Sequence, residues 1–501
     1  MDSRDLIIST KYGDVQGRSD GEVDSWLGIP FAKAPVGELR FKRAVEPDSY
    51  EGVLDCGKMK AAPVQFGGGM FGRLLRVKNA VSEDCLYLNV WAPKTRSENE
   101  KLPVFVYIFG GACHNGDAAL PENCPAAFAK DGIVAVNLNY RLGPLGFYDF
   151  SKYDSDFDSN CGLSDVIMAL KWINENIEKF GGDPSNVTIC GESAGGVIVY
   201  SLLAAPKARP YFSQAISMSG LPSNVVRWEL QKVYVDKLLN ELHIPFDNVK
   251  ALKTISLKKM AKVTEKFFKG MHIGNPGMML PAPVIDDLVT KHPEDAIRDG
   301  DINDKRVMLG TCKDEGTLFY FVKLGVRSLD EMREMLEING YGDRYDDFLE
   351  YYGGNGERAA VVKLNTDKMF RVDNIRCAVD LSRFTDVYMY QFDYVSVLGA
   401  YTKLGATHSF DICPALSSHA AKKRIPFVGD NVIRSININK KMHASFKAFI
   451  KTGSPENEEV GSWPRFTAQK RETMCMNDEC SLKENMHENM LKLWDGMTIY
   501  K

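Results

Sequence analysis

A serine in a glycine-bounded turn is the first candidate for chemistry. Gly191-Glu192-Ser193-Ala194-Gly195 fits the pattern G-x-S-x-G, with the apolar run Val187–Cys190 before it and the small-residue stretch Ala194–Ala205 after it. The glycines permit a tight turn from strand to helix that exposes the serine hydroxyl at the strand end. The start of the helix adds backbone N–H donors and positive partial charge. This context predicts a nucleophilic Ser193, and the alternative is a plain turn.

A nucleophilic serine needs donors for the oxyanion that forms on attack. Gly110-Gly111-Ala112 directly follows the predicted strand Val104–Phe109. Because side chains are absent or reduced to one methyl there, the backbone can approach a ligand closely. The N–H groups of Gly111 and Ala112, with that of Ala194, could form a three-donor oxyanion hole. Read alone, the segment equally fits a glycine-rich turn.

The serine also needs a base oriented by an acid. Asp314-Glu315-Gly316 follows the predicted strand Arg306–Leu309, and His408 follows the predicted strand Val387–Phe392. The chain order serine, acid, histidine is that of α/β-hydrolases. Order and position alone leave three histidines open as the base: His408, His419 and His443.

The elements that would position these residues alternate between strands and helices. The segment Asp165–Phe180 has helical periodicity, with Ser164 as the expected N-cap and Gly181-Gly182-Asp183-Pro184 as the stop. Short apolar runs between the helices indicate strands buried on both faces, the pattern of a parallel sheet covered by helices. The predicted strands are Val104–Phe109, Ile133–Leu138, Val187–Cys190, Ala215–Met218, Arg306–Leu309 and Val387–Phe392.

Two longer helical stretches interrupt this alternation, near residues 225–269 and 328–383. Insertions in such sheets can roof a site at the carboxyl ends of the strands, although plain scaffold is an equal alternative. Length alone suggests about three domains. Since no linker or repeat divides the chain, we expect residues 1–501 to form a single α/β domain.

The composition and the net charge indicate which classes of binding partner are not expected. Apolar residues make up 44 % of the chain and the formal net charge is −4, so nucleic acid and anionic membranes are not expected as partners. No stretch has the length of a membrane helix, and the first residues do not resemble a signal peptide. Eleven scattered cysteines indicate reduced thiols. Together these features predict a cytoplasmic protein, and they do not determine its oligomeric state.

No cofactor or metal is expected. Gly67-Gly68-Gly69-Met70-Phe71-Gly72 formally matches G-x-G-x-x-G, but no strand precedes it, and a mobile flap is the favoured interpretation. Cys475, Cys480 and His487 do not match common zinc spacings.

The chain resembles the type-B carboxylesterase and cholinesterase family, in particular its non-secreted, para-nitrobenzyl-esterase-like members. The matching motifs run nearly from end to end. They are Gly28-Ile29-Pro30-Phe31-Ala32, Ser82-Glu83-Asp84-Cys85-Leu86-Tyr87-Leu88-Asn89-Val90, Asn139-Tyr140-Arg141-Leu142-Gly143-Pro144-Leu145-Gly146-Phe147, Phe180-Gly181-Gly182-Asp183-Pro184, the serine motif, Lys313-Asp314-Glu315-Gly316, the His408 segment and Trp463-Pro464.

The resemblance implies an α/β-hydrolase fold: a large, mostly parallel sheet with helices on both faces and helical insertions over the active site. It implies a serine hydrolase that cleaves small carboxylic esters through an acyl-enzyme intermediate. The residues that match family functions are the triad Ser193, Glu315 and His408, the oxyanion donors Gly111, Ala112 and Ala194, the acid-supporting Ser219, and two structural ion pairs, Arg40–Glu83 and Arg141–Asp165.

Departures from the family pattern refine these expectations. Pro63 stands where secreted relatives carry the disulfide partner of Cys85, and no cysteine lies between Ser219 and Cys312. Both absences favour a reducing compartment. The segment from Pro63 to Cys85 contains no tryptophan, so the cation–π platform of choline esterases is missing.

Two alternative functions stay open. A lipase would need a lid and an apolar acyl channel, for which Met70, Phe71, Leu74 and Leu75 are candidates. A non-catalytic, cholinesterase-like binding protein is disfavoured because serine, acid and histidine are all present.

Overall fold

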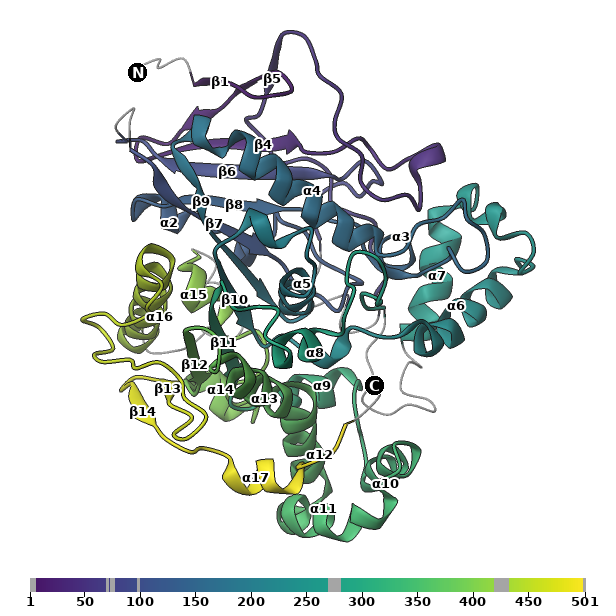
Figure 1. The fold of residues 1–501 in the computed structure, drawn as a ribbon, viewed down its shortest axis with the longest axis vertical. Helices are drawn as coiled ribbons and strands as arrows, with labels where there is room; N and C mark the ends of the chain where they lie inside the picture. Colours follow the sequence, from purple (N-terminus) through teal and green to yellow (C-terminus); the bar gives the residue numbers. More distant parts are fainter. Residues whose placement is uncertain are drawn as a thin grey trace.

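A mixed sheet of eleven strands organises the molecule. The computed structural model describes residues 6–68, 72, 77–96, 100–268, 281–418 and 432–498. The spatial strand order is β14-β13-β12-β11-β10-β9-β7-β8-β6-β4-β3, parallel from β13 to β8 and antiparallel at both margins (Figure 1). The strands are β3 (Arg18–Ser19), β4 (Val23–Pro30), β6 (Tyr87–Pro93), β7 (Leu102–Ile108), β8 (Val134–Leu138), β9 (Gly182–Glu192), β10 (Gln214–Met218), β11 (Arg306–Cys312), β12 (Val387–Phe392), β13 (Thr473–Met476) and β14 (Ser481–Lys483).

The central strands are the six that the apolar runs predict. Every residue of β8, β10 and β12 is buried, as expected for parallel strands covered on both faces. The expected mostly parallel sheet is therefore confirmed. The strands β9 and β11 exceed their predicted lengths most, because β9 begins at Gly182 and β11 continues to Cys312. A smaller sheet beside the main one contains β1 (Ile7–Ser9), β2 (Asp14–Gln16) and β5 (Val53–Asp55).

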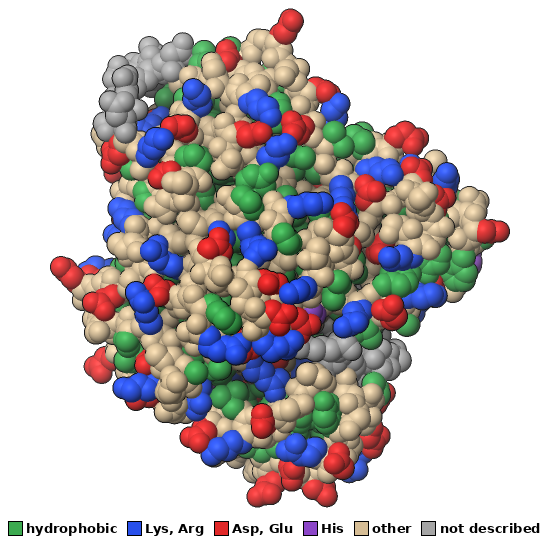
Figure 2. All heavy atoms as spheres, in the orientation of Figure 1, with side chains coloured by type: hydrophobic (Ala, Val, Ile, Leu, Met, Phe, Trp, Pro, Cys, Tyr) green, Lys and Arg blue, Asp and Glu red, His purple; other side chains and the backbone are tan. Residues whose placement is uncertain are grey.

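Helices cover both faces of the large sheet. On one face pack α4 (Cys161–Asn176), α5 (Ala194–Leu203) and α13 (Val372–Leu381); on the other pack α2 (Ala127–Lys130) and α16 (Val432–Thr452) (Figure 1). Among the described helices, none combines the length and the hydropathy needed to cross a lipid bilayer. The face drawn in Figure 2 carries basic and acidic side chains interspersed, in keeping with the small net charge.

The predicted N-cap of α4 is wrong. The helix begins at Cys161, three residues before Ser164. The Ser164 hydroxyl donates to the carbonyl oxygen of Cys161 at 2.7 Å and accepts from the backbone N–H of Ala44 at 3.0 Å. It therefore ties a distant loop to the helix instead of capping it. The predicted stop is confirmed, since a 3-10 turn ends at Phe180 and Gly181 has a φ of 90°.

Both predicted insertions are helical and project beyond the sheet as two lobes (Figure 1). The first contains α6 (Trp228–Leu242), a 3-10 turn (Val249–Lys253) and α7 (Leu257–Phe268). The second contains α10 (Leu329–Ile338), α11 (Tyr345–Tyr352), α12 (Glu357–Thr366), the π-helical turn η9 (Asp367–Arg371) and α13. In the second insertion α12 packs against α9 (Gly316–Val322), the helix that follows β11.

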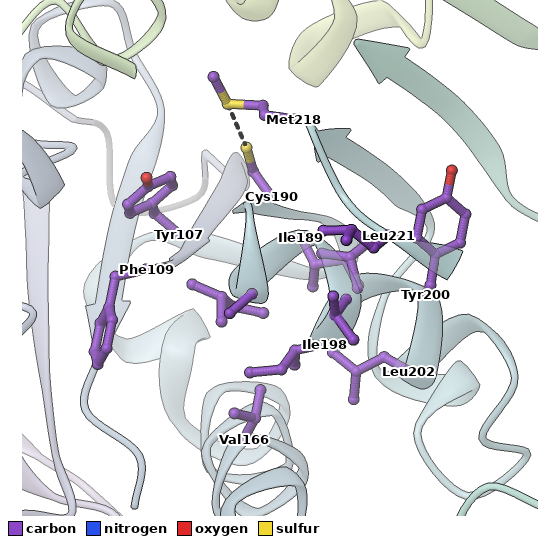
Figure 3. Packing of buried hydrophobic residues seen from close by; sticks show 14 of the residues in the cluster. Tyr107, Phe109, Val166, Ile189, Cys190, Ile198, Tyr200, Leu202, Met218 and Leu221 are labelled. Atoms are coloured by element: carbon purple, nitrogen blue, oxygen red, sulfur yellow. Dashed lines mark hydrogen bonds between the residues drawn. The ribbon is translucent and has the colours of Figure 1, made fainter. Parts of the chain in front are cut away.

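A continuous apolar core lies behind the serine turn. Figure 3 shows Ile189 of β9 lying towards Ile198 of α5 and Val166 of α4, whereas Met218 of β10 lies on the other side of the strands. All four are buried. This packing fixes α5 against the sheet and so fixes the turn that joins α5 to β9.

Two ion pairs, one partly buried and one fully buried, hold the loops around this core, and both are pairs that the family resemblance implies. Arg40 Nε lies 2.6 Å from Glu83 Oε1. Arg141 binds Asp165 in a bidentate manner at 2.8 and 2.6 Å, with at most 3 % of either side chain exposed. Removing one partner of such a pair leaves an uncompensated buried charge.

We therefore expect Arg141→Ala to lower the free energy of unfolding by about 3–5 kcal/mol. The matched control is Arg465→Ala, because Arg465 also pairs with an aspartate, Asp386, but is 65 % exposed. The control should change stability by less than about 1 kcal/mol. Urea unfolding followed by circular dichroism compares the two, and equal losses would contradict the structural role of the buried pair.

Candidate active site

Ser193 sits in a strained turn between β9 and α5. Its φ of 56° and ψ of −119° lie outside the favoured regions for a residue with a side chain. The turn is closely packed, because a Cβ on Gly195 would lie 2.1 Å from the carbonyl oxygen of Ile108, and one on Gly191 would lie 2.2 Å from that of Gly195. The glycines are thus required by space, and they hold α5 against the end of β7.

The register of the parallel strands brings two serines together. Glu192 of β9 pairs with Met218 of β10, which pairs in turn with Gly310 of β11. The backbone N–H of Ser193 donates to the carbonyl oxygen of Met218 at 2.9 Å, and the N–H of Ser219 donates to that of Gly310 at 2.8 Å. Ser193 and Ser219 therefore leave the ends of neighbouring strands side by side.

Glu315 is fully buried and receives three donors. Its Oε1 accepts from the Ser219 hydroxyl at 2.6 Å and from the backbone N–H of Cys312 at 2.6 Å. Its Oε2 lies 2.5 Å from His408 Nδ1. The structure thus brings the predicted acid, its predicted supporting serine and one of the three candidate histidines together.

The other candidate histidines have different surroundings. His443 lies on α16, where its ring contacts Asp131 at 2.8 Å and the carbonyl oxygen of Ala415 at 2.9 Å. His419 lies outside the described residues. Among the described histidines, His408 has the geometry that a base oriented by Glu315 requires.

The far side of the His408 ring faces a second carboxylate. Nε2 is buried and lies 3.3 Å from Glu192 Oε1, which also accepts from the Ser409 hydroxyl at 2.5 Å. Within the described residues, no hydrogen bond joins Nε2 to the Ser193 hydroxyl. Sequence reasoning gave Glu192 no role of its own, although it stands inside the serine motif.

The two carboxylates determine how His408 titrates. Burial alone would lower the pKa of His408, but the charges of Glu192 and Glu315 outweigh burial and raise the pKa to about 9. Burial raises the pKa of Glu192 to about 7, against the opposing effect of His408. Burial and the charge of Glu315 raise the pKa of Asp411 to about 6, and Asp411 accepts from the Tyr390 hydroxyl at 2.8 Å.

Two phenylalanine rings pack on the imidazole and on each other, with their own ring centroids 5.4 Å apart. The ring centroid of His408 lies 5.0 Å from that of Phe319 on α9 and 4.8 Å from that of Phe370 in η9. Sequence reasoning missed Phe370, because nothing local relates the second insertion to a histidine further along the chain.

The predicted oxyanion donors lie beside Ser193. Gly110 is so close that an added Cβ would lie 3.0 Å from Ser193 Cβ. Gly111 and Ala112 have φ values of 125° and 56°, and their N–H groups donate to no atom of the described residues. The N–H of Ala194 heads α5, where a helix supplies no internal acceptor.

Neither thiol chemistry nor a metal centre is indicated. Burial raises the pKa of the thiols of Cys113, Cys190 and Cys312, which keeps them protonated at neutral pH. All eleven cysteines lie in the described residues, and none of them forms a disulfide. In the described part of the chain, no group of three or more His, Cys, Asp or Glu side chains is arranged to hold a metal ion.

The strand ends of a mostly parallel sheet thus carry the serine turn and the carboxylate, with helices on both faces, and this is the α/β-hydrolase fold. The chain belongs to the carboxylesterase family, whose model matches residues 4–494. It is a serine hydrolase of carboxylic esters.

Individual relatives agree with this assignment over nearly the whole chain. It is 32 % identical over 486 residues to para-nitrobenzyl esterase of Bacillus subtilis, covering 96 % of each chain. It is 31 % identical to phenmedipham hydrolase of Pseudarthrobacter oxydans, covering 94 % of this chain and 95 % of that one. A solved structure of a PNB esterase superimposes with a TM-score of 0.88 at 30 % identity, covering 98 % and 99 % of the two chains.

The contact between Glu192 and His408 predicts a titration change. Glu192→Gln removes a negative charge that favours the imidazolium ion, so we expect the pKa of His408 to fall by about 1–3 units. NMR titration of protein with ¹³C-labelled histidine measures it, with the signal identified by its loss in His408→Asn. The control is Glu241→Gln, an exposed glutamate on α6. An unchanged His408 titration in Glu192→Gln would contradict the electrostatic coupling.

Proposed function

We propose that ester cleavage is carried out by Ser193 as nucleophile, His408 as general base and Glu315 as the acid that orients it. The observation that carries the proposal is the buried 2.5 Å contact between His408 Nδ1 and Glu315 Oε2 beside the strained Ser193 turn. A histidine fixed in this way presents Nε2 as the free nitrogen.

The reaction then follows from the positions of these groups. His408 Nε2 turns from Glu192 to the Ser193 hydroxyl when substrate binds, since catalytic hydrogen bonds often tighten only in the complex. Ser193 Oγ attacks the ester carbonyl carbon and its proton passes to Nε2. The oxyanion accepts from the N–H groups of Gly111, Ala112 and Ala194.

The tetrahedral intermediate collapses when Nε2 returns the proton to the leaving alcohol, which leaves an acyl group on Ser193. Water, deprotonated by the same nitrogen, attacks the carbonyl carbon of the acyl-enzyme. The second intermediate collapses as Nε2 returns the proton to Ser193 Oγ, and the carboxylic acid is released. Throughout these steps Ser219 and the N–H of Cys312 stabilise Glu315 as a carboxylate.

The proposed substrates are small-molecule esters, with para-nitrobenzyl esters as the first class to test, because that ester is named in the relative from Bacillus subtilis. A lipase remains a candidate for longer acyl chains, and its lid residues Met70, Phe71, Leu74 and Leu75 lie outside the described part. A non-catalytic binding protein is disfavoured, because all the groups required for hydrolysis are present.

We further propose that residues 1–501 act as one catalytic domain with the insertions beside its site, and that the protein works in the cytoplasm. The first proposal is supported by the spread of site residues from Gly111 to His408 over one sheet. The second is supported by the eleven cysteines, none of which forms a disulfide in the described structure.

Ser193→Ala tests the proposed nucleophile directly. We expect the variant to fold with the wild-type melting temperature and to lose at least about 10³-fold in kcat on p-nitrophenyl acetate. A fluorophosphonate should add mass to the wild-type serine peptide and not to the variant. Wild-type hydrolysis by Ser193→Ala would overturn the assignment.

Ser219→Ala tests the support of the acid. Losing one buried hydrogen bond to a charged group should raise the free energy of the correctly oriented Glu315 by about 1.5–3 kcal/mol. We expect a fall in kcat that is smaller than that of Ser193→Ala, with KM unchanged.

A separate assay of the wild-type enzyme distinguishes an esterase from a lipase. On p-nitrophenyl esters of increasing acyl length, an esterase favours the short chains.

A further inference from the structure

Arg371 is a buried cation that the proposed mechanism does not use. Only 6 % of the residue is exposed. Its Nη1 binds Asp367 Oδ1 at 2.6 Å, and Asp367 is itself 1 % exposed. Asp367 also accepts from the Tyr352 hydroxyl at 3.2 Å, and that hydroxyl accepts from Trp494 Nε1 at 2.9 Å.

The other arm of this arginine reaches the loop that carries Glu315. Arg371 Nη2 donates to the carbonyl oxygen of Lys313 at 2.9 Å and lies 3.4 Å from that of Cys312. The N–H of Cys312 is a donor to Glu315. Arg371 therefore binds the carbonyl oxygens of the short segment 312–313. The same segment binds Glu315 through the N–H group of Cys312.

Two neighbours of Arg371 contact the same machinery. Thr366 Oγ1 accepts from the N–H of Gly316 at 2.9 Å, directly after Glu315. Phe370 packs on the His408 ring at 4.8 Å. The backbone before Glu315, the backbone after it and the ring of its histidine partner are all contacted from one short segment, residues 366–371.

The π-helical turn η9 explains how one segment makes all three contacts. Asp367–Arg371 winds with i→i+5 hydrogen bonds, which place more residues in each turn than an α-helix has. Residues four and five positions after Thr366 consequently return to the same side of the helix. In a regular α-helix Phe370 would face the side of Thr366, but Arg371 would turn away from it.

The energetics of the Asp367–Arg371 pair point in the same direction. Burying two charges costs about as much as their attraction returns, so such a pair adds little net stability. What the pair does provide is a guanidinium fixed in one orientation, with Nη2 directed at the carbonyl oxygens of the loop.

We propose that Arg371, oriented by Asp367 and delivered by the π-helical turn η9, is a positioning residue for the acid–histidine pair, and that Phe370 positions the imidazole ring. The proposal rests on the proposed function of Glu315 and His408. It assigns the second insertion a part in setting the geometry of the reaction, with no contact to the substrate.

The decisive variant is the double substitution Asp367→Asn/Arg371→Gln. It removes both charges together, so the net charge near His408 does not change and neither partner is left as an unpaired ion. We expect kcat to fall by about 10- to 100-fold with KM within twofold, since a small misplacement of catalytic groups costs that much. The acid limb of kcat/KM should move to lower pH, because a looser Glu315 contact lowers the pKa of His408.

The matched control is Arg40→Gln. Arg40 also pairs with a carboxylate, Glu83, and donates to backbone carbonyl oxygens, those of Lys253 and Ile255 at 3.0 Å, but it holds the first insertion. Its substitution should lower the melting temperature and leave the pH profile and kcat unchanged. A wild-type profile and kcat in the double variant, or the same profile shift in the control, would overturn the role of Arg371.

Phe370→Leu tests the ring contact separately, with Phe449→Leu as control. Phe449 is equally buried on α16 and packs on Tyr388 instead of His408. We expect only Phe370→Leu to lower kcat and move the acid limb, and equal kinetics in the two variants would contradict the role of Phe370. Ser193→Ala keeps the two hypotheses apart: if it is inactive while the Arg371 and Phe370 variants behave as wild type, only the positioning proposal fails.

Discussion

A single buried carboxylate constrains the whole site. Glu315 is fully inaccessible to water, and an ionised carboxylate in such a place is tolerated only when donors surround it. The donors come from three separate segments: Ser219 after β10, the N–H of Cys312 in β11, and His408 after β12. Each is in place only if the strands β10, β11 and β12 have their observed register. Satisfying one side chain therefore fixes the edge of the sheet where chemistry takes place.

The neighbourhood of His408 combines rigidity with opposing charges. One nitrogen is committed to Glu315, and the other faces Glu192. The imidazole is buried and packs against a pair of contacting phenylalanine rings, and this low-dielectric setting strengthens both charge interactions. The two carboxylates together raise the pKa of His408, and the approach of substrate has to draw Nε2 away from one carboxylate while the other continues to hold the ring.

The sequence specifies the sheet and much of the site, because these depend on local patterns. Runs such as Val387–Phe392 are apolar on both faces. The glycines around Ser193 are required because the tight turn leaves no space for a Cβ at their positions. What local patterns miss is long-range contact. Ser164 resembles a helix cap, yet its hydroxyl is bound to Ala44. Choosing His408 over His443 required the family resemblance, and Phe370 carried no local signal because its partner is 38 positions away in a different element.

The order of the strands also governs when, during synthesis, the site can exist. β9 and the strands on its β7 side are complete once the first two hundred residues have emerged, so the serine turn and the oxyanion donors can form early. β10, β11 and β12 are then added one after another in chain order. Because the ribosome releases the chain from its N-terminus, the segment that carries Ser193 emerges before the segments that carry Glu315 and His408. The protein is thus made with its reactive group first and the means to activate it last.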